Sequence, residues 1–377
     1  TTVVKARTFH NGADELPSFV ETNTYFIDEA FSVPVISIAG DDLPTLMNGT
    51  WIEPIGSLEL FGESQQLLDE AWGEFNKHGN DSWAYAQRGI DYITRDQLGY
   101  ASSLAHQIFP GKSRDRFQRL ILKAAANDNY PFSFGGAHIR DAYVHTLSQK
   151  AGLALDERTW EPCILFVNGA YWGVYEIREK VDDPDFTRHY YDQGRKWIDF
   201  IKTWGSTWVE YGSWDDWYDL YDFIMTHDMS EPANYAFVQQ HLEVESLVDY
   251  IIINVHTVCK DWLNWNTAWW RGRKPTGLKK RWRYTLWDLD ATFGHYVNYT
   301  GIPDITPQAD PCDIEELSDN SDPEGHIDLL MALFQNPDFH DLYINRYADL
   351  NNTWLSCDSM LALLDAMIAR IAPEMPR

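Results

Sequence analysis

Four polar residues in the second half of the chain have the types and spacing needed to hold a metal ion beside a phosphate. Four residues separate Asp261 from Asn266, and one residue separates Asp288 from Asp290. Asp261 lies at the end of an apolar run, 243–262, that predicts a long buried helix, and Asp288 follows the alternating stretch RWRYTLW, which predicts a strand. In phosphoryl transfer one aspartate orients the acceptor hydroxyl, while an asparagine and a second acidic group hold Mg²⁺, which prefers oxygen ligands. The order of the four residues therefore favours a phosphoryl-transfer site, whereas either pair alone more often marks a polar turn.

The elements around these residues predict an α+β domain in which strands come first and helices later. We expect residues 1–28 to be the terminal strands of a preceding β module, because two alternating stretches flank an Asn-Gly pair. Residues 29–377 then form one domain, β-rich over about 29–180 and mainly helical over about 181–377. Residues 57–76 fit either a β-hairpin or a strand followed by a short helix. The other predicted elements are strands at 34–39, 117–123 and 281–287, a hairpin at 163–177, and helices at 137–151 and 338–372.

Composition excludes several classes of protein. The chain has 377 residues, of which 44% are hydrophobic, so it can bury a large core. Its 57 acidic and 30 basic residues give a net charge of −27, which argues against a nucleic-acid partner and favours a basic one. No stretch approaches the roughly 18 to 20 apolar residues of a membrane span. The four cysteines lack zinc-site spacing. One disulfide bridge, Cys312 to Cys357, could form if the protein is exported.

Two motifs carry a resemblance to a known family. The stretch FVNGAYWGVYEIREKVD resembles the signature hairpin of the CotH kinase family, with an Asn-Gly turn, a Gly-Val-Tyr strand and a glutamate, Glu179. The stretch WDLDATFG resembles the family's Trp-Asp-x-Asp-x-x-x-Gly, and Asp261 and Asn266 fall where the family has Asp-x4-Asn. The likeness covers about residues 32–372, and residues 1–28 resemble the closing strands of a chitobiase-type C-terminal β-sandwich.

The resemblance implies an atypical protein-kinase-like fold with a β-rich N-terminal part and a helical C-terminal part. It also implies ATP as the nucleotide, bound between these two parts, and Mg²⁺ or Mn²⁺ as the metal. By carry-over, Asp261 would be the catalytic aspartate, and Asn266, Asp288 and Asp290 would be metal ligands.

The resemblance also implies a nucleotide-binding turn. The stretch HGNDS resembles the family's glycine-containing turn, whose backbone N–H groups could cradle phosphate oxygens. The implied nucleotide contacts are His78, Gly79, Asn80, Ser82, Arg88, Lys123 and Glu179.

One position in this set departs from the family pattern. Arg88 stands where the family has a lysine, and a planar guanidinium does not replace an ammonium one for one. Lys123 is a second candidate for the phosphate contact, with an exposed lysine at a strand end as the alternative. Glu179 would steady the phosphate-binding cation, with a surface pair to Arg178 or Lys180 as the alternative.

These observations lead to one main hypothesis and three alternatives. The main one is a Mg-ATP-dependent kinase-like enzyme, bacterial and extracellular or cell-surface, that phosphorylates Ser or Thr of a basic or Ser/Thr-rich protein. A second enzyme hypothesis keeps the fold but uses ATP for adenylylation and amino-acid ligation, as in protein glutamylation. A third is a catalytically inactive glycan- or protein-binding module that uses the tryptophan-rich stretch 204–217. A glycosidase with paired carboxylates is the weakest alternative.

Overall fold

The protein is described by a computed structural model that covers residues 1–12, 16–99, 101–129, 135–295 and 322–376. The chain divides into two compact units. The first comprises Thr1–Ser133, Thr159–Lys180 and Asp365–Arg377, and the second comprises Phe134–Arg158 and Val181–Leu364. Both helices and strands are present, as the α+β prediction requires.

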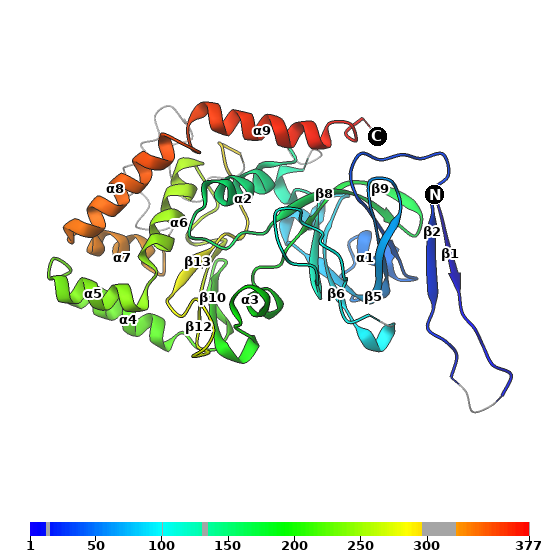
Figure 1. Cartoon of the computed structure of the whole chain (residues 1–377), viewed down its shortest axis with the longest axis horizontal. Coiled ribbons are helices and arrows are strands. Elements are labelled where there is room, and N and C mark those ends of the chain that lie inside the picture. The colour runs from blue at the N-terminus through cyan, green and yellow to red at the C-terminus, as the bar shows by residue number, and fades with distance from the viewer. Residues whose placement is uncertain (13–15, 100, 130–134, 296–321, 377) are drawn as a thin grey trace. The chain divides into compact units, whose positions relative to one another are not determined.

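Strands of the first unit form a closed barrel in the order β3-β4-β5-β6-β7-β9-β8 (Figure 1). Neighbours are antiparallel except β3 and β8, which run parallel. The strand β3 is buried along its whole length, which accounts for its unbroken apolar sequence. Residues 57–76, which fitted two structures, belong to the β4–β5 hairpin. The barrel strands are β3 (Val35–Ala39), β4 (Ile55–Phe61), β5 (Leu67–His78), β6 (Gly89–Thr94), β7 (Arg119–Lys123), β8 (Trp160–Val167) and β9 (Ala170–Arg178), and the short helix α1 (Leu43–Met47) lies between β3 and β4.

The predicted hairpin at the Asn-Gly pair is confirmed. Asn168 and Gly169 connect β8 to β9 and both have positive φ, +50° and +81°, as a two-residue type I′ turn requires. The Asn168 side chain also fixes the neighbouring strand end. Its Oδ1 accepts from the Gly40 amide, and its Nδ2 donates to the Gly40 carbonyl, both at 2.9 Å.

The predicted N-terminal strands are confirmed as a two-stranded antiparallel sheet, β1 (Thr2–Ala6) and β2 (Glu21–Tyr25). Thr24 of β2 donates through its amide to the buried Glu59 carboxylate of β4, at 3.0 Å. Burial raises the pKa of Glu59, and the hydrogen bonds from Thr24 partly oppose that shift. That these strands close a separate β-sandwich stays a prediction.

The second unit contains a four-stranded antiparallel sheet with the order β11-β10-β12-β13, so the later part of the chain is not purely helical. Figure 1 shows helices α4 to α8 grouped beside this sheet. The strands are β10 (Ile198–Thr203), β11 (Thr207–Tyr211), β12 (Thr267–Gly272) and β13 (Arg283–Thr285). The helices are α2 (Arg140–Ala151), α3 (Pro184–Tyr191), α4 (Asp215–Thr226), α5 (Pro232–His241), α6 (Val244–His256), α7 (His326–Leu333), α8 (Pro337–Asn351) and the start of α9 (Cys357–Ile371).

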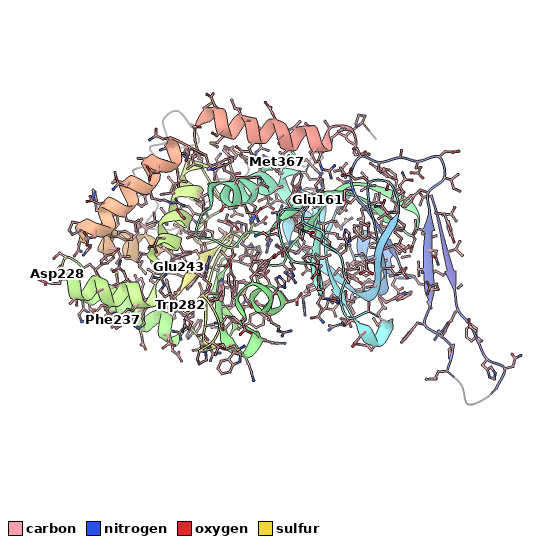
Figure 2. All side chains as sticks on the ribbon, viewed as in Figure 1. Glu161, Asp228, Phe237, Glu243, Trp282 and Met367 are labelled. Atoms are coloured by element: carbon pink, nitrogen blue, oxygen red, sulfur yellow. The ribbon has the colours of Figure 1, made fainter. Side chains whose placement is uncertain are left out.

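Tryptophans form much of the core of this unit. Trp217 of α4 packs edge-on or tilted against Trp269 and Trp282, with ring centroids 5.4 Å apart in both pairs. The Trp282 carbonyl accepts from the amide of Glu243, the residue that precedes α6, at 2.9 Å, and Figure 2 labels both residues. The start of α6 is therefore tied to the sheet.

The last residues of α9 contact the first unit, to which they belong. Arg370 donates to Glu161 of β8 at 2.9 Å, to Glu63 at 2.6 Å, and to the Ser32 carbonyl at 2.7 Å. Figure 2 labels Glu161 and the buried Met367 of the same helix. Burial raises the pKa of Glu161, against the effect of Arg370.

Several predicted elements were too long. The helix predicted over 137–151 begins at Arg140, and the tail predicted as helical over 338–372 is two helices, α8 and α9, separated by residues 352–356. The helix predicted over 243–262 ends at His256, because Val258 adopts a left-handed conformation with φ +50°. The amides of Val258 and Cys259 donate back to Val255 and Asn254, which is the Schellman pattern of a helix end.

The strand predicted over 281–287 is limited to Arg283–Thr285. The Leu286 amide leaves the sheet ladder and donates to the Asp156 carbonyl at 2.9 Å.

Candidate active site

The loop that follows α6 brings Asp261 and Asn266 together. The Asn266 side-chain nitrogen donates to Asp261 Oδ2 at 2.9 Å and to the Asp261 carbonyl at 3.2 Å. Asn266 is buried and Asp261 is half-buried. Val258, Leu263 and Asn266 all have positive φ, a conformation that costs free energy for residues with side chains. A loop held in such a conformation must be fixed by its surroundings.

The loop that follows β13 supplies that support. The Lys260 amide donates to the Ala291 carbonyl, and the Phe293 amide donates to the Thr257 carbonyl, both at 2.8 Å. The buried Lys260 ammonium also donates to the Gly294 carbonyl at 3.0 Å. The Asp261 loop and the Asp288–Asp290 loop are therefore joined through their backbones.

The carboxylates of both loops act on one buried thiol. Burial raises the pKa of Cys259 well above its ordinary value, and the charges of Asp261, Asp290 and Asp288 raise it further. The Asp261 amide, which hydrogen-bonds the sulfur, opposes this shift. Asp290 is 2% exposed and Asp288 is half-buried. The charges of both loops therefore act on the same buried thiol.

A buried pair on α2 fixes the backbone between the two aspartates. Asp141 Oδ1 accepts from the Leu289 amide at 2.8 Å. His145 is one helical turn further along, with its Nε2 3.4 Å from the same Asp141 oxygen. Its Nδ1 accepts from the Arg158 amide at 3.1 Å, which leaves the proton of the neutral ring on Nε2, facing Asp141.

The donor set fits a hard metal ion. Asn266 uses its amide nitrogen on Asp261, so the amide oxygen is the atom it can offer to a metal. In the described ranges no three or more His, Cys, Asp or Glu side chains are grouped so as to hold a metal by themselves. Mg²⁺ does not require such a cage, because one or two carboxylates plus phosphate oxygens and water usually complete its shell.

In the first unit, the predicted glycine turn connects β5 to β6 and is closed by a tryptophan. Trp83 Nε1 donates to the carbonyls of His78 and Gly89, at 2.8 and 2.9 Å. Gly79 has φ +90°, and a Cβ there would lie 2.5 Å from Ser82 Oγ, so the position requires glycine. Ser82 itself is buried.

His78 and Asn80 have different surroundings within this turn. His78 Nδ1 lies 3.0 Å from Asp91, which also pairs with Lys180 at 2.8 Å. Burial acts to raise the pKa of Asp91, but Lys180 and His78 outweigh it and hold the pKa well below its ordinary value. Asn80 is exposed and accepts from Lys77 at 3.4 Å. His78 therefore anchors the base of the turn, and Asn80 faces solvent.

Arg88 is bound to backbone carbonyls. Its guanidinium donates to Trp83 at 2.8 Å, to Met47 at 2.7 Å and to Ala86 at 3.4 Å. These bonds use the Nε and Nη1 of the guanidinium. We therefore interpret Arg88 as a residue that shapes the turn.

Lys123 and Glu179 occupy buried positions in the barrel. Lys123, at the end of β7, is 2% exposed, so the alternative of an exposed lysine is wrong. Glu179 is fully buried. It pairs with Arg114 at 3.1 Å and accepts from Thr159 Oγ1 at 2.7 Å.

The alternative of a surface pair for Glu179 does not fit either. Arg178 pairs with Glu176 at 3.0 Å, and Lys180 pairs with Asp91. Glu179, paired with a cation and a hydroxyl, is therefore a fixed buried charge directly after β9.

Sequence reasoning missed several supporting residues. Asp141 and His145 have a detectable signal, since an Asp and a His four positions apart share one face of a helix. Arg114 lies in the stretch GKSRDRF, whose sequence shows neither a helical nor a strand-like periodicity. Lys260 precedes Asp261 directly, but nothing in its neighbourhood predicts that its ammonium binds a carbonyl.

The tryptophan-rich stretch 204–217 is only partly on the surface. Trp204 and Trp214 are each 39% exposed, whereas Trp217 is buried. The Trp204 ring meets Trp265 edge-on, with centroids 4.9 Å apart, which is not the flat platform that stacks on sugar rings.

Two further predictions concern export and the membrane. Cys312 lies outside the described residues, and its predicted partner Cys357 is exposed with a free thiol. Within the ranges that the structure covers, no helix combines the length and apolar character needed to cross a membrane.

Comparison with known proteins identifies the family. The family model described as CotH kinase protein matches residues 97–377. This range contains Lys123, Glu179 and all the candidate residues of the second unit, but it begins after the turn at 78–89. No curated protein matches the chain. Because the match spans well over half of the sequence, the chain belongs to the CotH kinase family.

Proposed function

We propose that this protein is a Mg-ATP-dependent kinase that phosphorylates serine or threonine hydroxyls of a protein. The observation that carries the proposal is the Asp261–Asn266 hydrogen bond in a loop joined through its backbone to the Asp288–Asp290 loop. In a member of the CotH kinase family, these are the residue types that phosphoryl transfer needs for base and metal.

Each residue of the second unit has a distinct proposed role. Asn266, Asp288 and Asp290 would hold Mg²⁺, which neutralises charge on the phosphate oxygens. Asp261 would orient the acceptor hydroxyl and take its proton. The hydroxyl oxygen forms a bond to the γ-phosphorus, and the bond to the ADP oxygen breaks.

In the first unit, Lys123 is the better candidate for the phosphate contact. It is buried at the end of β7, and Glu179 is buried directly after β9, whereas Arg88 is bound to carbonyls. Arg114 and Thr159 would hold the Glu179 carboxylate in place. The turn at 78–82 remains a proposed phosphate cradle, with Gly79 as its conformational requirement.

Amino-acid ligation after adenylylation is less favoured by this arrangement. An arginine in place of the family's lysine at position 88 could favour that reaction, but the bonds of Arg88 to Met47 and Trp83 explain this residue structurally. The same loops could still bind ATP in either reaction, so the nucleotide product separates them.

The test is to incubate the full chain with ATP and MgCl₂ beside a lysine- and serine-rich acceptor protein. We expect ADP, and label from the γ-phosphate on serine or threonine. Release of AMP would contradict the proposal in favour of ligation, and neither product would indicate an inactive module. The variant Asp219→Asn removes an exposed carboxylate of α4 and should keep the wild-type activity.

A further inference from the structure

A cavity of about 770 Å³ in the second unit is lined mainly by charged and aromatic side chains. Its walls come from the end of α3, the turn before β10, the end of β11 and the β12–β13 connection. Its size lies in the range of protein ligand sites. Its charged lining residues are the cations Arg188, Arg195, Lys196 and Lys274 and the carboxylates Asp192 and Glu210.

Both carboxylates in the cavity already have cationic partners. Asp192 pairs with Lys274 at 2.5 Å. Glu210 pairs with the buried Lys202 at 3.3 Å and accepts from Trp208 Nε1 at 3.0 Å. Both carboxylates are therefore already paired with cations other than Arg188, Arg195 and Lys196.

Arg188, Arg195 and Lys196 have no carboxylate within ion-pair distance in the part of the chain that the structure describes. This is unusual in a chain with 57 acidic and 30 basic residues, where partners are plentiful. The neighbouring Arg273, for comparison, pairs with Asp199 at 2.9 Å. Three unbalanced cations around one cavity attract an anion.

Aromatic rings hold two of these cations in place. The Arg195 guanidinium lies 5.5 Å from the centroid of the Tyr211 ring. The Lys196 ammonium lies 5.5 Å from the centroid of the Trp197 ring. Such contacts orient a cation without neutralising it, so its charge stays available to a ligand.

The buried Gln193 lies between the lining residues Asp192 and Gly194 in the sequence. Its side chain accepts from the Lys274 amide at 3.0 Å and donates to the Leu278 carbonyl at 2.8 Å. A Cβ at Gly272 or Gly277 would come within 2.2 or 2.5 Å of this side chain, so only glycine leaves room for it. The β12–β13 connection is thereby fixed against the end of α3.

We propose that this cavity binds a peptide segment that carries phosphoserine or clustered carboxylates, so that a substrate already phosphorylated is retained for further transfer. Arginine forks match the geometry of phosphate oxygens, and the volume exceeds what a single phosphate fills. Retention of the enzyme's own product rests on the proposed kinase function, whereas the binding itself does not.

The test measures binding of a fluorescent serine peptide to the full chain without ATP, in three forms: with serine, phosphoserine or aspartate at one position. We expect at least about tenfold tighter binding for an anionic form than for the serine form, weakening as salt rises. Arg195→Gln and Lys196→Gln should each remove about tenfold of this affinity. Lys150→Gln, at an exposed lysine of α2, is the control and should bind like the wild type.

The three peptides also identify the source of the anion. Preference for phosphoserine indicates a phosphorylated substrate, and equal binding of the aspartate peptide indicates an acidic segment. Equal binding of all three, wild-type affinity in both cavity variants, or displacement by inorganic phosphate at peptide concentrations would overturn the inference. Because this assay contains no ATP, its result does not depend on catalysis, and an absence of ADP production in the separate kinase assay would leave the binding inference standing.

Discussion

Asp261 is the residue on which the proposed chemistry depends most. It is half-buried, it receives two hydrogen bonds from Asn266, and it follows a helix end at which Val258 has φ +50°. A β-branched residue in that conformation is strained, and the backbone bonds to the neighbouring loop offset the strain. The cost is reasonable if the carboxylate must be held in one orientation.

Replacing Asp261 with asparagine tests its role as a base. An amide oxygen can still accept from Asn266, so the loop should keep its shape and ATP affinity should change little. Phosphoryl transfer should fall by about 10²-fold or more, because a general base contributes roughly that factor. ADP production and ATP binding, measured on the same preparation, check both halves of this expectation. A variant that turns over at the wild-type rate would rule out Asp261 as the base.

At the scale of elements, the site depends on α2 as much as on the loops. Asp141 holds the Leu289 amide and lies against His145, so the first turn of α2 determines where Asp288 and Asp290 lie. These contacts act on the backbone of the loop that carries Asp288 and Asp290.

Asp141→Ala should loosen the metal loop and destabilise the second unit. The change leaves the Leu289 amide without its acceptor, which costs about 1–3 kcal/mol for a buried polar group, and it removes the carboxylate beside His145. We expect a lower free energy of unfolding in urea and a higher Mg²⁺ requirement for ATP binding. Asp141→Asn, which can still accept from Leu289, should lose less of both. Equal effects of the two substitutions would contradict the positioning role.

At the scale of the whole molecule, stability should depend on pH through a histidine in the tryptophan core. Burial lowers the pKa of His326 below its ordinary 6.5, and Asp322 and Glu324 offset part of the shift. Its Nδ1 lies 2.8 Å from the Tyr284 hydroxyl, and its ring packs on Trp269 with centroids 4.7 Å apart.

The sign of this dependence follows from proton linkage. Below pH 6.5 the unfolded chain protonates His326 while the folded chain does not, so the free energy of unfolding decreases as pH falls. His326→Gln should show a smaller loss between pH 7.5 and 5.5 than the wild type. His340→Gln, at an exposed histidine, should show the wild-type loss. Tryptophan fluorescence in urea reports the transition, and identical pH slopes for wild type and His326→Gln would refute the linkage.

Sequence alone predicted those parts of the fold that have a strong local signal. The Asn168–Gly169 hairpin, the helix ending before Gly152 and the two N-terminal strands were all readable, because turn chemistry and periodicity are local. The end of α6 was not readable, since a left-handed Val258 is fixed by bonds to residues 291–294, far along the chain.

The sequence predicted which residues belong to the candidate site, but it did not predict their hydrogen-bond and ion-pair partners. Asp261 and Asn266 are in contact, as their order suggested. The partners of Glu179 and Arg88 were not predictable, because Arg114, Thr159 and Met47 come from distant segments whose sequences carry no periodic signal.

The measurement that tests the central claim most directly is titration calorimetry of ATP with and without Mg²⁺ on wild type, Asp288→Asn and Asp219→Asn. The account predicts Mg²⁺-dependent ATP binding in the wild type and in the exposed control Asp219→Asn. It predicts at least about tenfold weaker binding in Asp288→Asn, which corresponds to 1.4 kcal/mol. Mg²⁺-dependent heat of wild-type size in Asp288→Asn, or no ATP binding by any of the three proteins, would contradict it.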